Sequence, residues 1–276
     1  LALLTKRLRA LIKGQNQVFY EGVGVSVPGR VDDATGRLVF APNLGWRDVD
    51  LKTPLERATG LPVELENAAN ACALAEAWFG EHREGVRDLV AVTVSEGIGT
   101  GIIANGQLLR GPTGLAGEFG HISINEDGPA CSCGNRGCWE RYASNSVAVA
   151  SYVQASDGHR NGRRASRQGP DPTFEDILRR AEQGDAKAGE ALDRMARYLG
   201  LGFAMLATAF APRLIVVVGE VTHAWDRVSP IITRVLAERC AIAAPRIVPA
   251  GDGGQGRLRG TIALVLQKHF GAPMVA

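Results

Sequence analysis

Hydrophobic residues recur along the chain with two periods, one typical of helices and one typical of strands. Over residues 1–13 the leucines return every three or four positions, which predicts an amphipathic helix. The stretch 21–27 alternates small and β-branched residues and predicts a strand, which Pro28-Gly29 then turns. The run Leu-Ile-Val-Val-Val at 214–218 is continuously apolar, as in a strand buried on both faces. Strands of this kind alternating with helices indicate an α/β fold.

Turn and cap signals mark where several further elements begin and end. Thr53 and Glu56 have the spacing of a capping box, with Pro54 at the first helical position, so a helix is predicted from there to Gly60. Asn105-Gly106 is a type I′ hairpin signal between two strands. Periodicity predicts further strands at 31–40 (a hairpin), 61–66, 88–94, 99–103 and near 247–248. It also predicts helices over 67–80, 139–153, 173–183, 185–211 and 258–270, and one that follows Gly219 and ends at about 241.

The densest chemistry of the chain lies in residues 117–140. Cys131, Cys133 and Cys138 fall close together, and His121 precedes them. Three thiolates and one imidazole form a complete tetrahedral set for zinc, and a closed set of this kind is structural, with no open position for reactive water. The alternative is a group of free thiols or a Cys-x-Cys disulfide, but such a disulfide would be strained. The spacing therefore predicts a structural zinc loop.

The same region resembles the ROK family (repressors, open reading frames and sugar kinases). The likeness is carried by Glu-Phe-Gly-His at 118–121 and by Cys-x-Cys-Gly-x-x-Gly-Cys-x-Glu at 131–140. The glycine-rich stretch 94–102 before it has the family spacing too, and the resemblance extends from Gly22 to Gly260. It implies a two-lobed, actin-like (ribonuclease H-like) α/β fold that carries the zinc loop.

The resemblance also implies how the chain divides and where it binds its ligand. One lobe is expected to comprise residues 1–67, completed by 258–276. The other is expected to comprise 68–257, with the zinc loop and the dimerisation helices, and the ligand is expected in the cleft between the lobes. The residues that the family pattern assigns to sugar hydroxyls are Asn43, Asn67, Glu118, His121 and Glu140.

The chemistry of these sugar-binding residues is consistent with that assignment. Carboxylates accept hydrogen bonds from hydroxyls, and an asparagine amide both donates and accepts. His121 would contact the sugar with one ring nitrogen and zinc with the other, so the metal would fix its tautomer and orientation. The alternative for Glu118 and Glu140 is a structural role in capping and loop salt bridges.

The catalytic parts of a sugar kinase are not matched. Active relatives carry Asn-Asp-Ala-Asn where this chain has Asn67-Ala68-Ala69-Asn70, so the catalytic aspartate aligns with Ala68. A methyl group cannot accept a proton, and loss of a general base costs roughly 10²- to 10⁴-fold in rate. The family's phosphate-binding Asp-x-Gly-Gly-Thr turn has no match in these residues either, and the chain begins after the place where that turn is expected. Glu220 follows Gly219 where kinases have two glycines beside the adenosine. No catalytic residue is assigned, and ATP is not expected as a ligand.

Two functions therefore compete. The leading interpretation is the sugar-sensing and dimerising region of a ROK-type transcription regulator, inactive as a kinase, whose DNA-binding segment is expected upstream of Leu1. The alternative is an ATP-dependent kinase for glucose, fructose, mannose or an N-acetylated amino sugar. A third interpretation is a degenerate member that keeps the zinc fold and binds no ligand.

Composition and charge limit the classes of partner that the chain is expected to bind. Hydrophobic residues make up 45% of the chain and charged residues 22%, and the net charge is +2, so no overall attraction to nucleic acid or anionic membrane is expected. No apolar run approaches the roughly 18 residues of a membrane helix. Zinc-type cysteine usage without a disulfide framework favours the cytoplasm.

A small sugar and a second copy of the chain, in a homo-oligomer, are the expected partners, and DNA is expected to bind only through the upstream segment. The arginine-bearing stretch 156–169 is predicted as a mobile surface loop.

Overall fold

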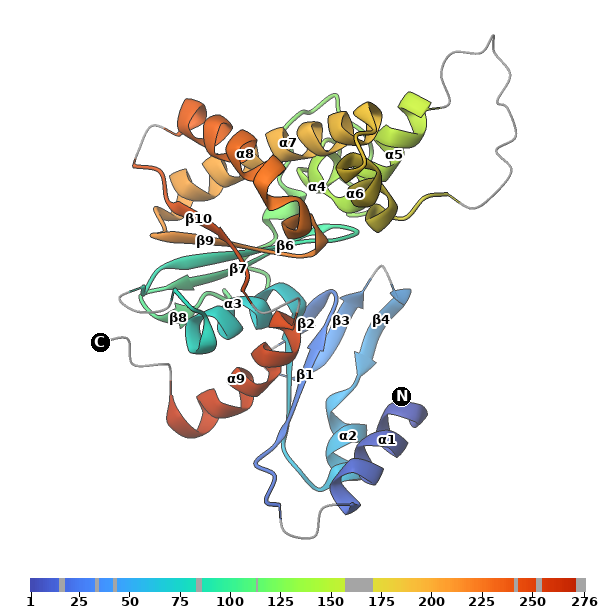
Figure 1. The fold of residues 1–276 in the computed structure, drawn as a ribbon. Coiled ribbons are helices and arrows are strands. Elements are labelled where there is room, and N and C mark those ends of the chain that lie inside the picture. The colour runs from blue at the N-terminus through green and yellow to red at the C-terminus, as the bar shows by residue number, and fades with distance from the viewer. Residues whose placement is uncertain are drawn as a thin grey trace. The chain divides into compact units, whose positions relative to one another are not determined.

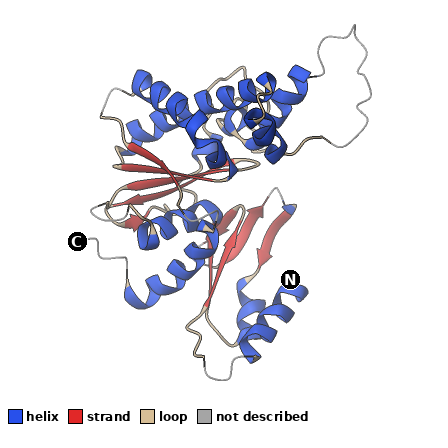
Figure 2. Cartoon of the chain, viewed as in Figure 1, coloured by secondary structure: helices blue, strands red, loops and turns tan. Residues whose placement is uncertain are grey.

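The computed structural model describes residues 1–14, 18–32, 35–41, 44–82, 86–112, 114–156, 171–240, 243–251 and 255–271. Helices and strands alternate along the chain, which confirms the predicted α/β class (Figures 1 and 2). The predicted loop at 156–169 lies, beyond its first residue, outside the described residues. The elements are α1 (Ala2–Lys13), β1 (Val23–Val27), β2 (Arg30–Asp32), β3 (Arg37–Ala41), β4 (Trp46–Asp50), α2 (Lys52–Thr59), β5 (Val63–Asn67), α3 (Ala68–Phe79), β6 (Leu89–Val94), β7 (Ile98–Ala104), β8 (Gln107–Leu108), η2 (Phe119–His121), α4 (Glu140–Ala143), α5 (Asn145–Ser156), α6 (Phe174–Glu182), α7 (Ala186–Phe210), β9 (Leu214–Val218), η3 (Glu220–Ala224), α8 (Trp225–Arg239), β10 (Arg246–Pro249) and α9 (Gly256–Phe270).

The chain forms two compact units. Unit 1 comprises residues 1–91, 101–117 and 251–276, and unit 2 comprises 92–100 and 118–250. The lobe boundary expected after residue 67 does not coincide with this division, because α3 packs closely on α9 within unit 1 (Figure 1). A Cβ added to Gly260 of α9 would lie 1.9 Å from the carbonyl oxygen of Ala71 in α3. Arg259 donates a hydrogen bond to the carbonyl of Phe79 at the end of α3 (2.8 Å), so the two helices are joined at that end as well.

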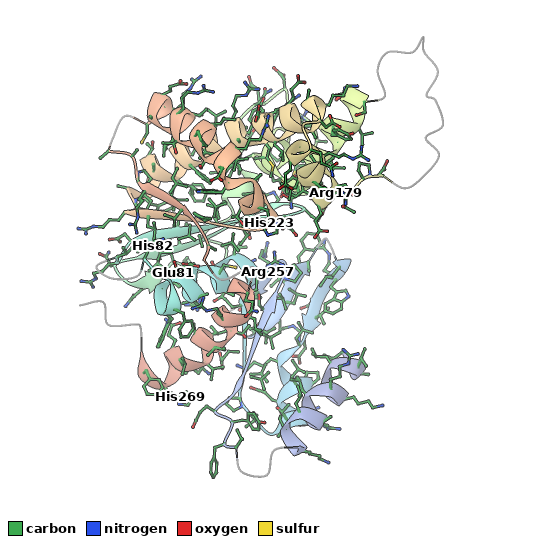
Figure 3. All side chains as sticks on the ribbon, viewed as in Figure 1. Glu81, His82, Arg179, His223, Arg257 and His269 are labelled. Atoms are coloured by element: carbon green, nitrogen blue, oxygen red, sulfur yellow. The ribbon has the colours of Figure 1, made fainter. Side chains whose placement is uncertain are left out.

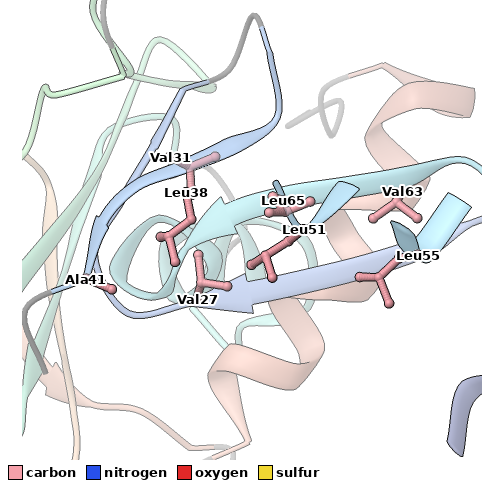
Figure 4. Packing of buried hydrophobic residues seen from close by; sticks show 8 residues of the cluster. All are labelled: Val27, Val31, Leu38, Ala41, Leu51, Leu55, Val63 and Leu65. Carbon is pink, nitrogen blue, oxygen red and sulfur yellow. The ribbon is translucent and has the colours of Figure 1, made fainter. Parts of the chain in front are cut away.

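Unit 1 contains a parallel strand pair and a small antiparallel sheet. β1 and β5 pair in parallel from Val23↔Val63 to Val27↔Asn67, and β2, β3 and β4 form the antiparallel sheet. Along β5, Val63 and Leu65 point into a buried apolar cluster, whereas the alternate residues Glu64 and Glu66 point to the other face, as strand geometry requires. The cluster that these elements share consists of Val27, Val31, Leu38, Ala41, Leu51, Leu55, Val63 and Leu65 (Figure 4).

The start of α2 differs from the capping box predicted at Thr53 and Glu56. The helix begins at Lys52, two residues earlier, and its N-cap residue, Leu51, makes no side-chain capping hydrogen bond. Asp50 accepts a hydrogen bond from the backbone N–H of Thr53 (3.0 Å), which lowers the pKa of the Asp50 carboxyl. Glu56 is used elsewhere, because it accepts from the backbone N–H of Val63 at the start of β5 (3.2 Å). Tertiary packing of α2 on β5 therefore competes with the local box and prevails.

A five-stranded sheet has the order β10-β9-β6-β7-β8. β9 and β10 pair in parallel, and β7 and β8 pair antiparallel as a hairpin. Asn105 and Gly106 both have positive φ (52° and 77°), which confirms the predicted type I′ turn. Every residue of β6 and of β9 is buried, as the continuous apolar run at 214–218 predicted.

The helices of unit 2 confirm most of the predicted spans and correct one. The helix predicted over 139–153 is two helices, α4 and α5, broken at Ser144, where the backbone is extended (ψ 163°). The break lets the N–H of Asn145 donate to the carbonyl of Ser95 (2.8 Å). α6 begins with the capping box of Thr173 and Asp176. No helix among the described residues has both the length and the apolar character that crossing a membrane requires.

α7 is the long helix of unit 2, and Asp185 caps its start by accepting from the N–H groups of Lys187 and Ala188. Five large apolar residues on one face of α7 are buried, and Phe210 is partly buried against Phe119 with ring centroids 5.2 Å apart. The buried face therefore belongs to the core of unit 2. Its members are Leu192, Met195, Leu199, Phe203 and Leu206.

Candidate metal and ligand site

The cysteine loop of unit 2 is folded by its glycines and by short backbone hydrogen bonds. The backbone N–H of Cys131 donates to the carbonyl of Asn135 (2.8 Å), and the N–H of Gly134 donates to the carbonyl of Cys131 (3.1 Å). Gly134 and Gly137 have φ of 93° and 66°, a region that non-glycine residues rarely enter. A Cβ on Gly137 would also lie 1.6 Å from the carbonyl oxygen of Asn125. These glycines are thus required for the cysteines to converge.

The predicted metal ligands are brought together. The ligand atoms of His121, Cys131, Cys133 and Cys138 all lie within 4.8 Å of one another. Cys131 Sγ is 3.6 Å from His121 Nδ1, and Cys133 Sγ is 3.6 Å from Cys138 Sγ. A tetrahedron with metal–sulfur bonds of about 2.3 Å has edges of about 3.8 Å, so the four donors fit one ion of that size. We call these four residues the Cys/His cluster.

No other group of this kind occurs among the described residues. Three further histidines of that part of the chain, His82, His223 and His269, lie outside the Cys/His cluster (Figure 3). The cysteines that the structure describes are all free of disulfides, which excludes the Cys-x-Cys disulfide weighed above.

Burial and mutual contact shape the acidity of the three thiols. Burial, reinforced by the neighbouring thiols, raises the pKa of Cys138 to about 12. Burial also raises the pKa of Cys131. Burial opposes ionisation of Cys133 too, but the backbone N–H of Asn135 and the two other thiols outweigh it and lower its pKa. In the metal-free protein at neutral pH, Cys138 therefore carries a proton that a bound metal ion would have to displace.

His121 faces the cluster with one ring nitrogen and a carboxylate with the other. Nδ1 lies beside Cys131, as above, and Nε2 lies 3.8 Å from Glu118 Oε2. That distance is too long for a hydrogen bond, so the two groups are neighbours without a direct bond. Both side chains are partly exposed, which leaves them accessible to a ligand.

Glu140 lies directly against the Cys/His cluster. Its Oε1 accepts a hydrogen bond from Cys131 Sγ (3.0 Å) and lies 3.4 Å from His121 Nδ1. On the other side, a Cβ added to Gly97 would lie 2.7 Å from Glu140 Oε2, so the carboxylate occupies space that only glycine leaves free. Three of the predicted sugar-binding residues, Glu118, His121 and Glu140, are thus side by side in unit 2.

The other two predicted sugar-binding residues belong to unit 1 or fall outside the described residues. Asn43 lies outside them. Asn67 is the N-cap of α3, where its Oδ1 accepts from the N–H groups of Ala69 (2.7 Å) and Asn70 (3.4 Å). Its amide nitrogen donates to the carbonyl of Gly29 (2.7 Å). Most of the hydrogen-bonding capacity of Asn67 is therefore used inside unit 1, with one N–H left.

A buried acid next to Asn67 was not identified as structural from the sequence. Glu66 is 2% exposed, and its Oε1 accepts from the N–H of Asn67 and from Asn70 Nδ2, both at 2.9 Å. Its Oε2 accepts from Nε and Nη2 of Arg110, at 3.0 and 2.9 Å. Because Arg110 is distant in sequence, no local pattern indicated this pair. Both carboxylate oxygens of Glu66, two residues before Ala68, are therefore occupied.

Glu220 is likewise held by a residue that the sequence did not single out. Its Oε2 accepts a hydrogen bond from Asn145 Nδ2 (2.7 Å), and Asn145 is 3% exposed. Gly219 before it has φ 131°, and a Cβ there would lie 2.0 Å from the carbonyl oxygen of Val94. The backbone at this turn is therefore specific to glycine, and the carboxylate of Glu220 is fixed within unit 2.

Comparison with known proteins identifies the family. The ROK family model matches residues 2–268. The chain belongs to the ROK family. It is 37% identical to a glucokinase of Halalkalibacterium halodurans over 92% of this chain and 76% of that protein. It is 38% identical to the xylose repressor of Bacillus subtilis over 71% of this chain and 47% of the repressor, so it spans about half the length of that relative.

A solved structure supports the same assignment. The fold matches the crystal structure of a ROK family transcriptional regulator, a homologue of the E. coli MLC protein, with a TM-score of 0.82 and 29% identity. The match covers 96% of this ROK chain and 67% of the regulator. Sugar-kinase-like architecture is thus common to the chain and to relatives of both kinds, kinases and repressors, and the likeness alone does not separate them.

Proposed function

We propose that this ROK chain is the sugar-sensing portion of a transcription regulator and has no kinase activity. The observation that carries the proposal is the combination of Ala68 with the occupied carboxylate of Glu66. Ala68 stands at the first position of α3, where the family's kinases have their catalytic aspartate, and it has no proton acceptor.

Glu66 does not supply the missing base. A general base needs a free lone pair within reach of the hydroxyl that loses its proton. Both oxygens of Glu66 are engaged, Oε1 by Asn67 and Asn70 and Oε2 by Arg110. A carboxylate so paired and buried is a structural support for the end of β5 and the start of α3.

The sugar side of the site supports ligand binding. Glu118, His121 and Glu140 form a group of two carboxylates and one imidazole that suits hydroxyl groups. Because a xylose repressor and a glucokinase are among the relatives, we assign the ligand to the neutral pentoses and hexoses.

The same proposal assigns zinc to the Cys/His cluster as a structural ion. The donor set is complete without water, and softness of thiolate ligands favours zinc over magnesium or calcium. When bound, the ion would hold the loop and orient His121, while Glu140 would be positioned by the loop residues around it. We further assign the protein to the cytoplasm and to a homo-oligomer, with DNA bound through a segment outside this sequence.

The second candidate function is an ATP-dependent sugar kinase. The similarity to the glucokinase of H. halodurans favours this function, because the match covers 92% of the present chain. Such an enzyme would need another base and a phosphate-binding turn, and it would have to tolerate Glu220 where it is held by Asn145.

Calorimetric titration of the zinc-loaded chain separates the two. Xylose, glucose, fructose, mannose and N-acetylglucosamine are added singly, with and without ATP and Mg²⁺. The proposal predicts saturable binding of one sugar that ATP does not change, with no heat of turnover. Sustained ATP-dependent heat, with ADP formed, would establish the kinase and overturn the proposal. A wild-type chain that bound no sugar, with metal bound and the fold intact, would overturn the sensor function.

A further inference from the structure

Trp139 joins the Cys/His cluster to the core of unit 2. It stands between Cys138, a member of the cluster, and Glu140, and it is fully buried. Its backbone N–H donates to the carbonyl of Ile122 (2.9 Å), beside the bridge between Ser123 and Cys138. The backbone of Trp139 thus belongs to the cysteine loop, while its side chain leaves the loop.

The indole of Trp139 docks on the middle of α7. Its Nε1 donates a hydrogen bond to the backbone carbonyl of Tyr198 (2.7 Å), an oxygen that has a second lone pair for the helix itself. The ring lies on Gly202, where an added Cβ would meet indole atoms at 1.9 and 2.0 Å. Phe203 packs edge-on against the same ring, with centroids 6.2 Å apart. The absence of a side chain at Gly202 is what admits the indole to the helix surface.

We infer that Trp139 is a positioning residue that fixes Cys138 and Glu140 relative to α7, so that metal binding by the Cys/His cluster depends on the indole's contact with Tyr198 and Gly202. The backbone carries this dependence, because Trp139 is bonded to both neighbours. A displaced indole would shift the Sγ of Cys138 from its place beside Cys133 and the carboxylate of Glu140 from its place beside Cys131.

A second aromatic contact between this region and α7 supports the inference. Tyr142 of α4 packs against Tyr198 of α7 with ring centroids 4.8 Å apart, so α4, which begins with Glu140, meets α7 next to the indole. The cluster therefore has two adjacent aromatic attachments to one turn of α7.

The test measures metal affinity rather than stability alone. Trp139→Phe removes the Nε1 donor and part of the ring, and Gly202→Ala keeps the indole but displaces it. Co²⁺ replaces Zn²⁺ as a spectroscopic probe, and its affinity is measured by competition with a chromogenic chelator. Loss of a residue that supports metal ligands typically costs about 10- to 100-fold in affinity, and we expect a loss in this range for both variants. The thiolate–cobalt absorption bands should shift as well.

Leu192→Ala is the matched control. Leu192 is fully buried on the same helix, ten positions before Gly202 and therefore about 15 Å away along the axis. It should lower the unfolding temperature and leave the cobalt affinity and spectrum unchanged. Equal cobalt affinity in the wild type, Trp139→Phe and Gly202→Ala would overturn the inference, and so would an equal loss in Leu192→Ala. If Gly202→Ala fails to fold, Trp139→Phe decides.

The effect on Glu140 rests on the proposed function, so it is measured separately. With the sugar identified by the panel above, Trp139→Phe should weaken sugar binding about tenfold even when metal is supplied in excess. Unchanged sugar affinity under these conditions would overturn the part of the inference that concerns Glu140. If the wild type binds no sugar at all, the proposed function fails, and the cobalt measurement still decides the coupling of the Cys/His cluster to α7.

Discussion

Glu66, whose side chain is buried just before the start of α3, forms an ion pair with the partly exposed Arg110, with Arg110 Nη2 2.9 Å from Glu66 Oε2. The carboxylate's other oxygen is bonded to Asn67 and Asn70, the first residues around the helix start. The pair thus holds the end of β5. It also explains why the carboxylate of Glu66, although close to Ala68, is not available as a general base.

Arg110→Met should destabilise the protein by about 3 kcal/mol, since it leaves the buried charge of Glu66 without its partner. We take the lower end of the usual range because Arg110 itself is partly exposed. Urea unfolding measures the change. Arg37→Met serves as the control, since its pair with Asp48 is exposed and should contribute little. Equal stability of Arg110→Met and the wild type would show that the pair is not needed.

Cys133→Ser should abolish metal binding and lower stability together. It removes one of four ligands, and structural zinc sites contribute an apparent free energy on the order of 10 kcal/mol. Metal content by elemental analysis and the unfolding temperature with and without chelator are the measurements. Sugar binding should be lost as well, because His121 would no longer be oriented. Cys240→Ser, outside the cluster, should match the wild type. Full metal content in Cys133→Ser would exclude that residue as a ligand.

Metal binding should release protons and strengthen as pH rises. The pKa of Cys138 is raised to about 12, so below that pH the metal-free thiol is protonated and the proton must leave when metal binds. Affinity should therefore rise by roughly tenfold per pH unit for each proton displaced. Chelator competition from weakly acidic to weakly alkaline pH, and proton release in weak buffer, both measure this. An affinity independent of pH would mean that the thiols are already ionised.

Gly97→Ala should weaken sugar binding while keeping the metal. The new methyl group would lie 2.7 Å from Glu140 Oε2, the far end of a side chain that can turn away. Because a hydrogen bond to a charged group is worth about 1.5 kcal/mol or more, the affinity should fall about tenfold. Gly14→Ala, at a position with ordinary φ and no close neighbour, is the control. Unchanged sugar affinity in Gly97→Ala would argue against a role for Glu140.

Glu140→Gln tests the same residue without a steric change. It keeps the shape and removes the charge, so sugar binding should weaken by about tenfold while the metal content stays at the wild-type level. Glu140 contacts Cys131 and His121, and these contacts make the metal measurement informative. Loss of metal in Glu140→Gln would show that the carboxylate supports the cluster itself.

Ala68→Asp should not produce a kinase. The added carboxylate would stand in the first turn of α3, where a negative charge is favourable by about 0.3–1 kcal/mol, so stability should be kept or slightly raised. A coupled ADP assay with the identified sugar should show no turnover, since the phosphate-binding turn is not matched. Turnover in Ala68→Asp would show that the chain lacks only the catalytic base, and it would overturn the regulator proposal.

Several features could be predicted from the sequence because neighbouring residues determine them. The cysteine spacing predicted the convergence of the cluster, and the Asn105-Gly106 pair predicted the turn between β7 and β8. The helix predicted over 173–183 formed as α6, and so did the long helix that follows it, α7. Each of these depends on short-range sterics and hydrogen bonds, which residues close in sequence supply.

Other features could not be predicted, and each involves residues far apart in sequence. The box at Thr53 and Glu56 is replaced because Glu56 bonds to β5 instead, and the helix predicted over 139–153 breaks because Asn145 bonds to Ser95. The hydrogen bond from Arg110 to Glu66 likewise joins two residues that are far apart in sequence.

The sequence by itself therefore determined the α/β class, most element positions, the family likeness and the convergence of the Cys/His cluster in this ROK chain. Only the tertiary structure decided which carboxylates are occupied, namely Glu66 by Arg110 and Glu220 by Asn145, and where Trp139 anchors the cysteine loop. The physical reason is that the chemical type of a side chain determines which groups it can bond to. The packing of elements distant in sequence determines which of those groups lies within hydrogen-bonding distance.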